Sequence, residues 1–130
     1  MKVLVFGNPL VEQDSMPFRL LPKLRKAFPA IEFKEFDPAE DLQEEGRNLT
    51  IIDSIEGIEE VRVLTDTDKI ETQRVYSLHD FDLGLTLKLL KKMGLVDSVT
   101  VIGVPMKGST EKIFKQVKSA LKEISTTSSP

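Results

Sequence analysis

The sequence contains no cysteine and no tryptophan, and its 130 residues include only one histidine and one tyrosine. Without cysteine the chain cannot form a disulfide, a thiolate nucleophile or a cysteine-ligated zinc site. It also has no apolar run of about 18 residues, the length expected of a membrane-spanning helix. The net charge is -3 with mixed signs, so nucleic-acid binding is not predicted. A cytoplasmic location without membrane insertion is the simplest expectation.

The length and the 40% apolar content suffice for one compact domain. We therefore expect residues 1–130 to form a single domain, with 125–130 as a frayed tail. The apolar segment 2–6 is too short for a signal peptide and is interpreted as the first strand.

Apolar runs and period-two alternation predict the strands. The predicted strands are 2–6, 31–36, 48–53, 59–65 and 98–104. Helical spacing predicts helices at about 17–28, 79–93 and 109–124, and a short acidic helix or turn at 38–46. Pro22 predicts a kink or a late start in the first helix.

Alternation of strands and helices is typical of an α/β fold. We expect a three-layer sandwich with a mostly parallel, twisted five-stranded sheet and helices on both faces. Right-handed crossovers would place the first strand beside the third, with the second outside. Open sheets of this kind bind ligands at the carboxyl ends of the strands, where the strand order reverses.

The predicted helix at 79–93 is rich in leucine. Its expected buried stripe consists of Phe81, Leu85, Leu89 and Met93, widened by Leu83, Leu87 and Leu90. Gly94 is expected to end this helix.

Acidic residues and the single histidine fall at the same predicted edge of the sheet. Glu12 and Asp14 follow the first strand, and Asp53 ends the third. The loop before the leucine-rich helix brings Tyr76, Ser77 and His79 there as well. Two carboxylates and an imidazole can bind a divalent metal with open positions, or can act in general acid–base catalysis.

Each of these residues also has a purely structural interpretation. Asp14 could cap the first helix, and Asp53 could accept hydrogen bonds from loop amides. His79 could be an ordinary residue at a helix start, and Glu12 a solvated loop acid. The convergence of Asp14, Asp53 and His79 on one edge favours a functional site.

Phosphate binding has weaker support. The chain lacks both G-x-G-x-x-G and G-x-x-x-x-G-K-[ST]. The segment "GVPMKGST" (103–110) is a candidate anion loop because Lys107 and Gly108 precede a predicted helix. An ordinary strand-to-helix connection is the favoured interpretation.

Over residues 2–122 the sequence resembles the hydrogenase maturation proteases. The resemblance rests on Gly7-Asn8 with Leu10 and Gln13-Asp14, on Asp53 in "IIDS", and on Ser77-Leu78-His79 before the leucine-rich helix. The strand "VTVIGV" also resembles the last strand of the family. The chain departs from the family's pattern at Val5, at Gln13 and in the Met16-Pro17 region.

The resemblance implies an endopeptidase that removes the C-terminal extension of a NiFe hydrogenase large-subunit precursor after nickel insertion. Asp14, Asp53 and His79 would be its metal-binding and catalytic residues. The nickel would be presented by the precursor rather than held tightly by the enzyme itself. This leaves open whether an aspartate acts as general base. The alternative is a non-catalytic metal-sensing or metal-carrying module of the same fold.

Overall fold

The computed structural model describes residues 1–6, 15–36, 42–65 and 83–127. The strands are β1 (Lys2–Val5), β2 (Glu32–Glu35), β3 (Asn48–Ile55), β4 (Arg62–Leu64) and β5 (Ser98–Pro105). The helices are α1 (Met16–Ala27), the 3-10 helix η2 (Leu42–Glu45), α3 (Leu83–Lys92) and α4 (Thr110–Thr127).

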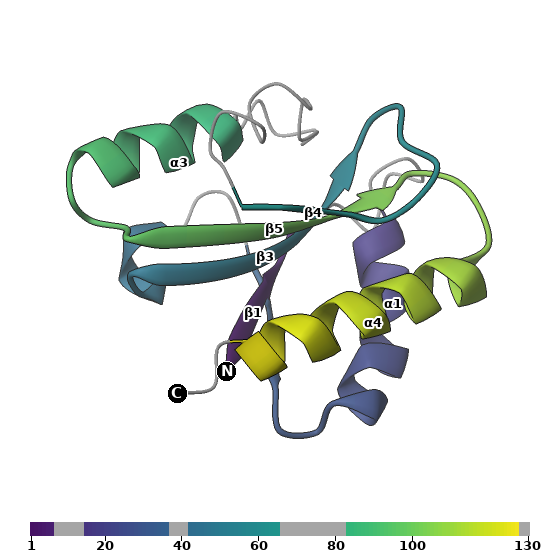
Figure 1. Ribbon diagram of the computed structural model, residues 1–130. Coiled ribbons are helices and arrows are strands. Elements are labelled where there is room, and N and C mark those ends of the chain that lie inside the picture. Colours follow the sequence, from purple (N-terminus) through teal and green to yellow (C-terminus); the bar gives the residue numbers. More distant parts are fainter. Residues whose placement is uncertain (7–14, 37–41, 66–82, 128–130) are drawn as a thin grey trace.

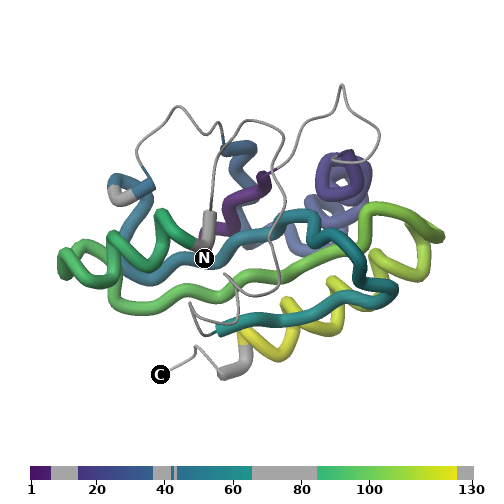
Figure 2. Tube along the Cα trace, turned by 90° about the horizontal axis from the view of Figure 1, so that it is seen from above, coloured from purple at the N-terminus to yellow at the C-terminus, as the bar shows by residue number. Residues whose placement is uncertain are grey.

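The five strands form one sheet in the order β2-β1-β3-β5-β4. β1, β2, β3 and β5 are parallel, and the edge strand β4 is antiparallel to β5. Figure 2 shows this order from purple β1 through β3 and green β5 to teal β4. The predicted α/β class is confirmed, as is the placement of the first strand between the second and the third.

Helices cover both faces of the sheet, with α3 on one side and α1 and α4 on the other (Figure 1). Side chains alternate along each strand, so each face has its own core. Leu49, Ile51 and Ile55 of β3 pack with Leu87 and Leu90 of α3 in the first core. Ile52 points the other way, into the core formed with α1 and α4.

Helix α1 continues through Pro22 without interruption. Pro22 was predicted to cause a kink or a late start. The helix begins at Met16, with a proline in its first turn, so the late start is wrong. The buried residues Leu20, Leu21 and Leu24 anchor it to the sheet. This packing outweighs the loss of one helical hydrogen-bond donor at the exposed Pro22.

Helix α3 turns a different side to the sheet from the one predicted. Leu87 and Leu90 are buried, whereas Leu85, Leu89 and Met93 are 46%, 50% and 69% exposed. Leucines surround most of this helix, so the pattern alone could not select the buried side. The end of the helix selects it: Gly94 has φ 73°, Leu95 N–H donates to Leu90 O over 3.0 Å, and Val96 enters the core.

Helix α4 is longer than predicted. Ser109 caps it, with Oγ accepting from Lys112 N–H over 3.3 Å. The helix continues to Thr127, so residues 125–127 are helical and are not part of a frayed tail. No helix among the described residues is long and apolar enough to cross a membrane.

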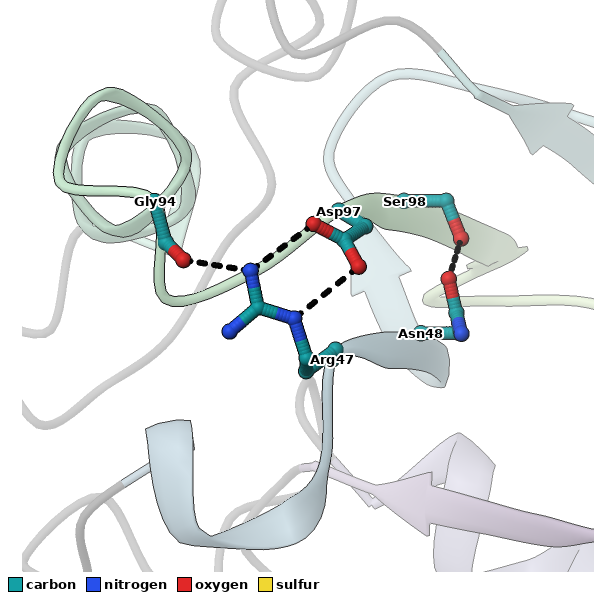
Figure 3. A network of polar contacts seen from close by, with 5 residues as sticks. All are labelled: Arg47, Asn48, Gly94, Asp97 and Ser98. Atoms are coloured by element: carbon teal, nitrogen blue, oxygen red, sulfur yellow. Dashed lines mark hydrogen bonds and ion pairs between the residues drawn. The ribbon is translucent and has the colours of Figure 1, made fainter.

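The amino ends of β3 and β5 are joined to the end of α3 by polar contacts (Figure 3). Arg47 donates to both carboxylate oxygens of Asp97, over 2.9 and 3.0 Å, and to Gly94 O over 2.5 Å. The hydrogen bonds from Arg47 lower the pKa of Asp97. Ser98 Oγ donates to Asn48 Oδ1 over 2.7 Å. These hydrogen bonds stabilise the amino edge of the sheet, opposite the carboxyl edge at which ligands are expected.

A second ion-pair cluster holds η2 against the sheet. Glu45 accepts from Lys2 Nζ over 2.7 Å and also forms an ion pair with Lys34. The Glu45 side chain is only 7% exposed. Hydrogen bonds from Lys2 and Lys34 hold its pKa below its ordinary value.

Candidate functional site at the carboxyl edge of the sheet

The carboxyl ends of β1 and β3 define the edge at which the strand order reverses. From β1 the chain crosses to β2 on one side, and from β3 the sheet continues to β5 and β4 on the other. In an open parallel sheet this reversal leaves room for a ligand beyond the strand ends. The described residues at this edge include Phe6 after β1, whose N–H donates to Ile52 O over 2.9 Å, and the residues at the ends of β3 and β5.

Asp53 is the one predicted site residue within the described part of the chain. It lies on β3, opposite Gly103 of β5, and is fully buried. By strand alternation it faces the same side as Ile51 and Ile55, which is the α3 side of the sheet. Its Oδ1 accepts a hydrogen bond of 2.8 Å from Ser54 N–H. The carboxylate is thus fixed on the face covered by the helix that follows His79.

The sequence pattern predicted that the third strand ends at Asp53, and this boundary is wrong. β3 continues through Ser54 to Ile55, which pair with Val104 and Pro105 of β5. Both added residues are buried, and Ile55 belongs to the core under α3. The buried Ser54 faces the opposite side of the sheet from Asp53. The carboxylate therefore sits two residues inside the edge of the sheet.

The remaining predicted site residues lie outside the described residues. They are Glu12, Asp14, Tyr76, Ser77 and His79. Within the described ranges no cluster of three His, Asp or Glu side chains could hold a metal ion. The N-cap of α1 is Ser15, so the helix boundary does not support a capping role for Asp14. The convergence of Asp14, Asp53 and His79 stays a prediction.

Gly103 makes room beside Asp53 for the Ile55 side chain. A Cβ at position 103 would lie 1.9 Å from Ile55 Cδ1 and 2.7 Å from Cγ1. Ile55 is itself fully buried, so it has little space into which to move. Glycine is required here by the close approach of a side chain. The pair Gly103 and Ile55 thereby fixes the packing next to the carboxylate.

A pocket of about 780 Å³ opens just beyond Asp53 at the same edge. The turn after β3 forms one wall with residues 56–59, and the turn after β5 forms the other with Met106, Lys107 and Gly108. Both turns lie together where β3 and β5 end (Figure 1). Val61 N–H donates to Gln116 Oε1 of α4 over 3.0 Å and ties the first wall to that helix. The volume of the pocket is typical of a ligand-binding site.

The charges of the pocket argue against an anion site at "GVPMKGST". Lys107 and Gly108 do line it, but Glu56 and Glu59 face the same space. Two carboxylates beside one ammonium disfavour a phosphate. Residues 106–109 connect β5 to α4, which is the favoured interpretation of this segment.

Solved structures with the same arrangement of elements include hydrogenase maturation enzymes. The hydrogenase maturating endopeptidase HybD from E. coli is similar at TM-score 0.63 and 19% identity, over 95% of this chain and 93% of that one. This is the fold of the hydrogenase maturation endopeptidases. A hydrogenase 3 maturation protease is similar at TM-score 0.60 and 20% identity, over 90% of this chain and 86% of that one. An uncharacterized protein from Wolinella succinogenes is similar to this chain at TM-score 0.53 and 17% identity, over 98% of this chain and 95% of that one.

No protein-family model matches the sequence, and no curated protein does. The likeness to the maturation endopeptidases therefore lies in the fold, and it spans nearly the whole chain. It agrees with the resemblance found from the sequence motifs.

Sequence reasoning missed the wall of the pocket formed by the β3–β4 turn. Gly57, with φ 83°, lies between the two glutamates and was a detectable turn signal. The sequence could not indicate that this turn meets the one after β5, because that contact depends on the β3–β5 register.

Proposed function

We propose that this protein is an endopeptidase that removes the C-terminal extension of a NiFe hydrogenase large-subunit precursor after nickel insertion. The observation that carries the proposal is the maturation-endopeptidase fold with Asp53 buried near the carboxyl end of β3. That position is next to the reversal of strand order, where this type of sheet binds ligands.

In this proposal Asp14, Asp53 and His79 complete the coordination of a nickel ion that the precursor already carries. Carboxylate and neutral imidazole are suitable nickel ligands. The buried position of Asp53 supports the role, because a carboxylate away from bulk water attracts a cation more strongly. The enzyme would hold no tightly bound metal of its own.

The nickel would then polarise a carbonyl or a water molecule for hydrolysis. No covalent intermediate is needed, which suits a chain without cysteine. The pocket beyond Asp53 provides space for substrate residues next to the cleaved bond. The lack of cysteine also suits our proposal that the reaction takes place in the cytoplasm.

The test is incubation of the purified protein with a nickel-loaded large-subunit precursor, followed by measurement of the product mass. The proposal predicts two fragments whose masses sum to the precursor plus one water. A metal-sensing or metal-carrying module of the same fold would bind the precursor and leave its mass unchanged. That outcome would reject the peptidase function and retain the metal-dependent interaction.

A further inference from the structure

The pocket beyond Asp53 has walls of opposite charge. Glu56 and Glu59 lie in the turn after β3, and Lys107 lies in the turn after β5. All three residues are exposed. Within the ranges that the structure describes, none of their side chains takes part in a hydrogen bond or an ion pair. Both carboxylates can therefore face a ligand that enters the pocket.

Apolar groups line the space between the two walls. Ile58 and Met106 are half-buried and lie on opposite walls, each next to a charged residue. Ile58 also packs against the core on the α3 side of the sheet, which is the side that Asp53 faces. Gly57 and Gly108 line the pocket without side chains and so leave the space open. The pocket thus combines an apolar lining with two carboxylates on one wall.

Both walls are held by contacts outside the pocket. Beyond the first wall, Val61 N–H donates to Gln116 Oε1 of α4. Beyond the second wall, Ile113 N–H donates to Ser109 O over 3.0 Å, so that α4 begins directly after the turn. A pocket whose walls are fixed in advance loses less conformational entropy on binding than a flexible one.

We propose that this pocket is a subsite for an arginine or lysine side chain of the precursor. The aliphatic stem of such a side chain would lie against Ile58 and Met106. Its cationic end would face Glu56 and Glu59, and a guanidinium group has enough donors to bind both carboxylates. Lys107 on the other wall repels the same cation, so it directs the cationic end toward the two glutamates.

The pocket is close enough to Asp53 for one peptide to reach both. Asp53 lies two residues before Ile55, the last residue of β3, and the pocket begins at Glu56. Two residues of a strand or of an extended peptide span about 7 Å. A basic residue in the pocket would then lie about two or three positions from the cleaved bond. This inference rests on the proposed function, since the basic residue would belong to the precursor.

The test is a titration of the full-length protein with short alanine peptides that are blocked at both ends and differ only in their central residue. The central residue is arginine, lysine, norleucine or glutamate. Amide chemical shifts of Gly57 and Gly108 report binding in the pocket, and Gly94 at the amino edge is the reference. We expect the arginine and lysine peptides to bind at least about fivefold more tightly than the norleucine peptide, as two exposed ion pairs would produce. The glutamate peptide should bind most weakly.

Charge variants locate the contact. Glu56→Gln/Glu59→Gln should remove the preference for the arginine peptide over the norleucine peptide. Lys107→Gln should strengthen binding of the arginine peptide, because a repelling charge is removed. The matched control is Glu32→Gln/Glu44→Gln, which changes the net charge by the same amount at exposed positions near the amino edge of the sheet. The control should retain the preference.

Equal affinity for the arginine and norleucine peptides, no shift at Gly57 and Gly108, or an unchanged preference in Glu56→Gln/Glu59→Gln would overturn the proposal. A norleucine peptide with a free α-ammonium group is a further control. If it bound as tightly as the blocked arginine peptide, the pocket would be a site for a chain terminus and the side-chain proposal would be wrong. No peptide bond is cleaved in these titrations, so a failure of the peptidase function would leave their result unchanged.

Discussion

Asp53 and Gly103 face each other across the parallel pairing of β3 and β5, and the side chain of Ile55 occupies the space that a Cβ at Gly103 would need. The candidate carboxylate therefore lies opposite the position at which the Ile55 side chain fills the space beside a glycine.

Gly103→Ala should destabilise the protein by about 1–3 kcal/mol, because the new methyl group would overlap Ile55 Cδ1 and Cγ1. The free energy of unfolding can be measured by urea denaturation. In an Ile55→Ala background the same change should cost much less, since the overlapping atoms are gone. Additive losses from the two substitutions would show that this contact does not constrain the edge.

Leu87→Ala should lower the free energy of unfolding by about 2–5 kcal/mol, because Leu87 is fully buried beneath α3. Leu89→Ala is the matched control on the same helix. It should change stability by no more than about 0.5 kcal/mol, since Leu89 is half exposed. A large loss from Leu89→Ala would mean that α3 packs with the side first predicted from its sequence.

These two leucines show what the sequence could and could not predict. Element types follow from sequence patterns, and the place of the first strand between the second and the third follows from the rule of right-handed crossovers; both are confirmed. The orientation of α3 does not follow, because its leucines surround the helix and the buried side is selected by the turn at Gly94. The extension of β3 past Asp53 was missed for a related reason, since it depends on pairing with β5.

The candidate site was predictable only in part. Asp53 was identified because it directly follows the apolar run of the predicted third strand, at the edge where ligands bind, and its position near the strand end supports the choice. The pocket formed by the turns after β3 and β5 was not predictable, because residues 56–59 and 106–108 are brought together by tertiary register. Asp14 and His79 lie outside the described residues, so their part of the site stays a prediction.

The ion pairs of Glu45 should make stability depend on pH in the acidic range. Lys2 and Lys34 lower the pKa of Glu45 below its ordinary value of 4.5. A group with a lowered folded-state pKa contributes its full stabilisation above its unfolded pKa, and this is lost as the pH falls through the folded value. Glu45→Gln should therefore destabilise the protein at pH 7 and much less at pH 3.

Thermal unfolding of wild type and Glu45→Gln at both pH values measures this difference. Glu44→Gln is a suitable control, because Glu44 is an exposed neighbour in the same 3-10 helix. If the difference in unfolding temperature between wild type and Glu45→Gln were equally large at pH 3 and pH 7, the electrostatic explanation would be contradicted.

Asp53→Asn should reduce precursor cleavage at least about 100-fold while leaving the fold intact. The asparagine Oδ1 can still accept the hydrogen bond from Ser54 N–H, but the charge that would attract nickel is gone. Asp97→Asn, on the amino edge of the sheet, is the control and should retain activity. Circular dichroism of the variants checks that the fold is unchanged, and equal activity of wild type and Asp53→Asn would exclude Asp53 from the site.

His79→Ala should likewise abolish cleavage with little change in thermal stability, as expected of a ligand at the edge of a sheet. Comparable thermal losses from His79→Ala and Leu87→Ala would instead identify His79 as a structural residue.

In the proposed function the protein acts on a precursor only after recognising the nickel bound within it. The most direct measurement compares cleavage of nickel-loaded and metal-free precursor by chelator-treated enzyme, with product masses recorded over time. We expect cleavage of the nickel-loaded precursor only, by protein that contains little metal of its own. Efficient cleavage of the metal-free precursor would contradict nickel recognition and would leave Asp14, Asp53 and His79 as candidates for general acid–base catalysis.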